Sequence, residues 1–129
     1  MLVIFLAICT IGGFAQNIDK INDMVKNGEL DKAKEGVDQL LTNAKQQKKV
    51  EAWIAKAKVY AAIAANDKFK TLVPDGRADA FAAIKKAEEI DKNELVKQLT
   101  LESYKPIYDL YAGYFDLGAS QYNAEKYED

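Results

Sequence analysis

The chain has 129 residues, with 18 Lys plus Arg, 20 Asp plus Glu, no His and one Cys. Without an imidazole, Ser-His-Asp and Cys-His catalysis, a His-ligated metal and a histidine pH switch are all excluded. The net charge of −2 lacks the basic excess that attracts DNA or RNA, so nucleic acid is not an expected partner.

The N-terminal segment 1–16 contains no charged residue. Leu2 to Ile11 is nearly continuous apolar sequence, and Gly13 and Ala15 are the small residues that precede a cleavage point. This pattern is typical of a secretory signal peptide and is too short for a membrane span, although no basic residue precedes the apolar core. We therefore expect residues 1–16 to be removed and the remainder to be exported, periplasmic or secreted, in a bacterial cell. The alternative is a buried N-terminal helix or strand.

The single cysteine, Cys9, lies inside this apolar segment. A lipoprotein signal has a small residue before its cysteine, whereas Ile8 stands here, so lipidation is not expected. Removal of the segment leaves a chain without cysteine, which fits a bacterial envelope protein better than a disulfide-stabilised extracellular one.

Apolar residues at helical spacing fill the remainder of the chain, and no segment alternates as a strand does. Asn27-Gly28 divides the first stretch into two helices, and Pro74-Asp75-Gly76 marks the clearest loop. Pro106 falls in the first turn of the last helix, where proline is tolerated. The expected helices are 17–26, 30–46, 50–61, 78–90 and 103–123, with a loop over 66–76. The predicted fold class is all-α.

The predicted helices come in pairs, and three stretches keep the spacing of one repeat pattern. The middle pair has its aromatic, small and tyrosine positions at Trp53, Ala57 and Tyr60, followed by Ala80, Ile84, Ala87 and Lys92. The tail repeats the first half with Tyr114, Leu117, Gly118, Gln121 and the turn aromatic Tyr127, and the start keeps Gly28, Leu30, Ala33, Val37 and Leu40. These residues resemble the tetratricopeptide repeat (TPR), a 34-residue helix–turn–helix.

The resemblance implies a weak repeat over 17–48, a repeat with an inserted loop over 49–93, a connecting helix over 94–110 and a half repeat over 111–129. It implies helix pairs stacked as a right-handed solenoid, and a closed helical bundle is the alternative architecture. Ala57, Ala80, Ala87 and Gly118 would allow close helix approach, while Trp53, Tyr60, Ile84 and Tyr114 would fill the gaps between pairs. A half repeat also predicts a fragment, with further repeats C-terminal to Asp129.

Two groups of carboxylates could be mistaken for catalytic residues. Glu88 and Glu89 are adjacent on a helix, so they point in different directions, and the lysines around them and Asp91 indicate a solvated face. The segment 75–79 does not keep a calcium-loop pattern, so Asp79 is interpreted as a helix cap. We expect no enzyme, no cofactor and no metal.

Tyr104, Tyr108, Tyr111 and Phe115 share one helical face. Packing between helices explains such a face, and the alternative is a groove that binds a glycan or small ligand. The TPR resemblance instead implies binding of another protein or peptide through a concave surface that the first helix of each pair lines. The residues predicted to line it are Glu51, Ile54, Lys58, Phe115, Ala119, Tyr122 and Asn123.

Overall fold

The computed structural model describes residues 17–126 and confirms an all-α fold, with no strand in that range. The predicted signal peptide with Cys9, and the turn aromatic Tyr127, lie outside the described residues. The elements are α1 (Ile18–Lys26), α2 (Leu30–Leu40), the short 3-10 helix η1 (Gln46–Lys48), α3 (Val50–Ala64), the 3-10 helix η2 (Lys70–Leu72), α4 (Gly76–Ile90), α5 (Lys92–Leu101) and α6 (Lys105–Lys126).

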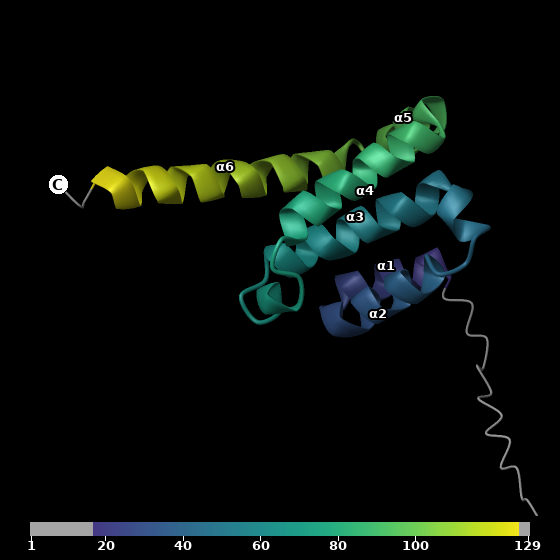
Figure 1. Ribbon diagram of the computed structural model, residues 1–129, viewed down its shortest axis with the longest axis horizontal. Coiled ribbons are helices and arrows are strands. Elements are labelled where there is room, and N and C mark those ends of the chain that lie inside the picture. Colours follow the sequence, from purple (N-terminus) through teal and green to yellow (C-terminus); the bar gives the residue numbers. More distant parts are fainter. Residues whose placement is uncertain (1–16, 127–129) are drawn as a thin grey trace, which may run out of the picture.

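The helices stack as antiparallel pairs, α1 with α2 and α3 with α4, and α3 contacts most of the other helices (Figure 1). The first part of α6 lies against α3 and α4, and its C-terminal part extends beyond the other helices (Figure 1). This stacking is compatible with both a solenoid and a bundle. Across residues 17–126, no helix is both long and apolar enough to cross a membrane.

Small residues bring α3 and α4 together, as their spacing in the sequence predicts. Ala57, Ala80 and Ala87 are almost completely buried between the helices. Gly76 permits a still closer approach, because a Cβ at this position would lie 3.0 Å from the Cβ of Ala64. The largest fully buried side chains, which form the centre of the core, are Ile21, Ile63, Val37 and Val59.

Three local expectations prove wrong. The second helix ends at Leu40, because turns and η1 occupy the rest of the predicted 30–46 range. Asp79 is not the cap of α4: the helix begins at Gly76 and Asp79 lies in its first turn. Gly118 does not mediate a close helix approach, because it is exposed on α6 and a Cβ at this position would meet no neighbouring atom within 4 Å.

The chain reverses between α5 and α6 through two residues with left-handed backbone angles, Ser103 at φ 52° and Tyr104 at φ 58°. The Tyr104 N–H donates to the Leu99 carbonyl oxygen at 2.7 Å, which closes the end of α5. The reversal falls inside the range 94–110 that was expected to be one connecting helix. As a result α6 runs back past α3, and its first turns contact the core. Pro106 and Leu110 are the buried residues in these turns.

Candidate functional site

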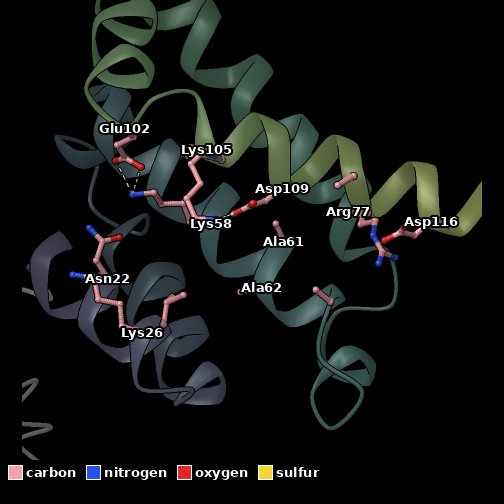
Figure 2. Close-up of a pocket in the computed structure, with 15 residues that line it drawn as sticks. Asn22, Lys26, Lys58, Ala61, Ala62, Arg77, Glu102, Lys105, Asp109 and Asp116 are labelled. Carbon is pink, nitrogen blue, oxygen red and sulfur yellow. Dashed lines mark hydrogen bonds and ion pairs between the residues drawn. The ribbon is translucent and has the colours of Figure 1, made fainter.

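A cleft of about 850 Å³ lies between α1, α3 and α6 (Figure 2). Its walls come from segments far apart in the sequence: Val25 and Lys26 on α1, Ala61 and Ala62 on α3, and Asp109 on α6 all line it. Two of the three, α1 and α3, are the first helices of the pairs α1–α2 and α3–α4, and α6 closes the third side of the cleft. Its volume lies within the range of small-ligand and peptide pockets.

The floor of this cleft is made of small side chains. Ala61, Ala62 and Ala65 present methyl groups from α3, and Ala112 and Gly113 face them from α6. Side chains of this size leave the space between the helices open, whereas leucine or phenylalanine would fill it. An apolar floor without polar groups favours burial of apolar side chains from a ligand.

Gly113 also makes room for the side chain of Arg77. A Cβ at position 113 would lie 2.6 Å from the Arg77 Nε, so any other residue here would require the arginine side chain to shift. Figure 2 shows Arg77 and Asp116 pointing toward one another at this end of the cleft. The end away from α5 therefore has both a cation and a carboxylate at its rim.

An ion pair bounds the cleft at its other end. The Lys58 Nζ on α3 contacts both carboxylate oxygens of Glu102, the residue that follows α5 (Figure 2). Both side chains are partly buried, at 24% and 37% exposure. Asn22, Lys58 and Glu102 line the cleft on one side and a second hollow on the other, so they form the partition between the two.

The second hollow, which we call the acidic pocket, has a volume of about 300 Å³. It lies at the N-terminal ends of α1 and α3, and Ile18 and Ile54 form part of its wall. Three carboxylates and one ammonium group line it. Its complete lining is Ile18, Asp19, Asn22, Glu51, Ile54, Ala55, Lys58, Gln98 and Glu102.

The cleft and the acidic pocket share one continuous face of α3. Ile54, Lys58, Ala61 and Ala65 follow one another at steps of three or four residues, which is the spacing of a single helical face. The face from residue 51 to residue 65 is about 21 Å long, at 1.5 Å per residue. A ligand on this face would meet methyl groups at one end and carboxylates at the other.

The predicted binding residues divide into two groups. Glu51, Ile54 and Lys58 line the acidic pocket, and Lys58 also lines the cleft. The structure does not bring the α6 group to either hollow: Phe115, Ala119, Tyr122 and Asn123 are exposed along α6 and absent from both linings.

Several lining residues escaped the sequence-based prediction, among them Asn22, Val25 and the alanines of α3. For α3 a usable signal existed, because Ala61 and Ala65 continue the series from Glu51 and Lys58 at helical spacing. For Asn22 and Val25 on α1, the only indication in the sequence was that this helix is the first of its pair.

The aromatic residues of α6 do not pack between helices in the described part of the chain. Tyr108, Tyr111 and Phe115 are exposed by 68%, 72% and 69%. Tyr114 and Leu117, on a different face of the helix, are each 42% exposed. The packing explanation for this aromatic face is therefore wrong for residues 17–126.

A polar network lies between α2 and α3. The Tyr60 hydroxyl donates to Asp38 Oδ1 at 2.7 Å, and the Lys34 ammonium donates to the other carboxylate oxygen at 2.7 Å. Burial raises the pKa of the Tyr60 phenol, and the hydrogen bond to Asp38 raises it further. These residues line neither hollow, and they link the first helix pair to the second.

The carboxylates of α4 lie on a solvated face, as the sequence predicts. Glu88 and Glu89 pair with Lys85 and Lys86, one turn earlier on the same helix. Asp91 accepts a hydrogen bond from the Glu94 N–H at 3.0 Å and so caps α5. Within residues 17–126, no group of three or more His, Cys, Asp or Glu residues is arranged to hold a metal ion.

Comparison of the chain with protein-family models, with curated proteins and with solved structures gives no match.

Proposed function

We propose that this protein is an exported, non-enzymatic, TPR-like scaffold that binds a peptide segment of another protein in the cleft between α1, α3 and α6. The single observation that carries the proposal is the composition of the cleft, with Ala61, Ala62 and Ala112 on its floor and charged side chains along its rim. Apolar burial supplies affinity, and the charged rim orients the ligand.

A packed helical scaffold offers this surface at small entropic cost. Two of the three helices that line the cleft are fixed by the core along their length, with Ile21 of α1 and Val59 and Ile63 of α3 fully buried. Binding therefore orders the peptide and few groups of the protein, which leaves more of the contact energy as affinity.

The cleft can be tested by closing it. In Ala112→Trp, an indole would occupy the cleft from the α6 side, and because Ala112 is exposed the substitution leaves the core intact. Ala82→Trp is the matched control, since Ala82 is an exposed helical alanine on α4 that lines neither hollow. A random 12-residue peptide library displayed on phage is selected on the full chain.

The selected peptides should bind the wild-type chain and Ala82→Trp equally, and Ala112→Trp at least about tenfold more weakly, which corresponds to about 1.4 kcal/mol. Peptides that bind all three proteins equally, or no enrichment at all, would overturn the proposal. Circular dichroism of the three proteins checks that the helices are retained.

Export is the second part of the proposal and rests on the uncharged segment 1–16. Expression of the full gene in a bacterial host, followed by fractionation and intact mass measurement, should recover an extracytoplasmic chain cleaved after Ala15 or Gln16. An intact chain in the cytoplasmic fraction would contradict it.

Glycan or small-ligand binding by the α6 aromatic residues is a second candidate, and the exposure of Tyr108, Tyr111 and Phe115 favours it. Tyrosine offers a flat apolar ring with a polar tip, which suits a sugar face. A change in tyrosine fluorescence on addition of oligosaccharides, lost in Tyr108→Ser with Tyr111→Ser, would support this function. Such a result without any effect of Ala112→Trp would assign binding to α6 instead of the cleft.

A further inference from the structure

We propose that the acidic pocket takes the Lys or Arg side chain of the peptide whose apolar residues lie in the neighbouring cleft. This inference rests on the proposed function and specifies the chemistry of the partner: an apolar stretch flanked by one basic residue. The two hollows meet at Asn22, Lys58 and Glu102, so one ligand can reach both.

The charged side chains of the acidic pocket differ in whether they have an ion-pair partner. Among the described residues, the only ammonium group that lines it is that of Lys58, which is already held by both oxygens of Glu102. Asp19 and Glu51 form no ion pair with any residue in the range 17–126. The pocket therefore keeps two carboxylates that can receive a cation.

The walls of the acidic pocket suit the remainder of a basic side chain. Ile18, Ile54 and Ala55 provide apolar surface, against which the methylene groups of lysine or arginine can pack while the charged end reaches a carboxylate. A volume of about 300 Å³ suits one long side chain and not a folded segment. The side-chain amide N–H of Gln98 donates a hydrogen bond to Glu94. The carbonyl oxygen of the same Gln98 side chain remains able to accept a hydrogen bond.

The cleft on the other side of the partition has a different charge balance. Lys26, Arg77 and Lys105 stand on its rim together with Asp109 and Asp116, so cations and carboxylates are nearly matched there. Of the two hollows, only the acidic pocket has a marked excess of one sign. A peptide with a basic residue at one end is thus bound in one direction along α3, because the reversed peptide would place its charge at the Arg77 end, where a guanidinium group already stands beside the Asp116 carboxylate.

Asp19 and Glu51 also lie in the first turns of α1 and α3, where a carboxylate stabilises a helix irrespective of any ligand. The chain offers a matched control for this effect. Asp31 and Asp79 lie in the first turns of α2 and α4, are exposed, and line neither hollow. Asp19→Asn with Glu51→Gln, and Asp31→Asn with Asp79→Asn, remove the same charge from equivalent positions.

The experiment uses the phage-displayed 12-residue library on the full chain, keeping only peptides whose binding Ala112→Trp abolishes. These peptides should share a Lys or Arg at a fixed position beside apolar residues. Asp19→Asn with Glu51→Gln should weaken their binding by about tenfold at low salt and less at high salt, while Asp31→Asn with Asp79→Asn leaves it unchanged. Replacing the basic residue of the peptide by Gln should weaken binding to the wild type and have no further effect on the pocket variant.

Cleft-dependent peptides without a fixed basic residue, or with unchanged affinity for the pocket variant, would overturn the inference and leave the proposed function standing. An equal loss in the two double variants would also overturn it, since that result assigns the effect to helix stability. The absence of any peptide sensitive to Ala112→Trp would overturn the proposed function itself.

Discussion

The Nζ of Lys58 lies 2.7 Å from Oε1 and 2.6 Å from Oε2 of Glu102, although the two residues are 44 positions apart in the sequence. The pair joins α3 to the end of α5 at the boundary between the cleft and the acidic pocket. Most other ion pairs of the described chain join residues three or four positions apart on one helix. The Lys58–Glu102 pair instead connects elements that are distant in the sequence.

Because both side chains are partly exposed, this pair should stabilise the fold only modestly. A double-mutant cycle with Lys58→Met and Glu102→Gln should give a coupling energy of about 0.5 kcal/mol in urea unfolding, decreasing toward zero in 1 M salt. The pair Lys105–Asp109, confined to α6, serves as a comparison. A coupling that salt leaves unchanged would show that the contact is not mainly electrostatic.

Two glycines should respond in opposite directions to replacement by alanine. Gly76→Ala should lower the free energy of unfolding by about 1–2 kcal/mol, because its Cβ would meet the Ala64 Cβ at 3.0 Å and the Tyr60 carbonyl oxygen at 3.1 Å. Gly118→Ala should raise it by up to about 1 kcal/mol, since the site is open and alanine favours the helix. Chemical denaturation measures both, and equal effects would contradict the close approach at Gly76.

The stability of the protein should fall at alkaline pH because of Tyr60. Its folded-state pKa is raised above the ordinary value of 10.0 by burial and by its hydrogen bond to Asp38. Below pH 10 the phenol is protonated in both states, so this contribution is fully present. As the pH rises above 10, the unfolded chain releases the proton while the folded chain keeps it, and the free energy of unfolding falls by up to about 1.4 kcal/mol per pH unit.

Tyr60→Phe isolates this effect, because it removes the phenol hydroxyl and no other ionisable group. The variant should lose about 1 kcal/mol at pH 7 with the hydrogen bond to Asp38, and its stability should decline less steeply above pH 10. Urea unfolding at pH 7, 9, 10 and 11 gives both quantities. Parallel curves for the two proteins would refute the assignment to Tyr60.

The reversal between α5 and α6 should be stabilised by glycine at position 103. Ser103 has a φ of 52°, which costs an L-residue about 1–2 kcal/mol and costs glycine little. Ser103→Gly should therefore raise the midpoint of thermal unfolding, corresponding to a gain of about 1 kcal/mol. Ser120→Gly, inside α6, should lower it by about 0.5 kcal/mol, because glycine disfavours a helix interior. A lower midpoint for Ser103→Gly would contradict the left-handed geometry.

The helical class and the pairing of the central helices could be predicted because they depend on local spacing. Alanine at positions 57, 80 and 87 recurs where helices must approach closely, and these residues are buried in the contact between α3 and α4. Glu51, Ile54 and Lys58 are grouped because the TPR resemblance implies that this helix lines a binding surface, and all three line the acidic pocket.

The orientation of α6 could not be predicted in this way. A displacement of one residue along a helix turns its face by about 100°. Burial of Pro106 and Leu110 against the core directs Asp109, Ala112 and Asp116 to the cleft, and Phe115 consequently points to solvent. Spacing within one helix carries no information on which of its sides the core will bury.

Because the core holds α6 only near its N-terminal end, a tilt of this helix would move its C-terminal end the most. Its buried contacts are concentrated at Pro106 and Leu110, and the exposed length begins soon afterwards. A tilt of about 10° about Pro106 would displace the helix axis at Asp116 by about 3 Å and at Lys126 by about 5 Å, at 1.5 Å per residue. Such a tilt would change the gap beside Arg77 and leave the span beside Glu102 almost unchanged. A ligand with a bulky group would therefore fit more easily at the Arg77 end than at the Glu102 end.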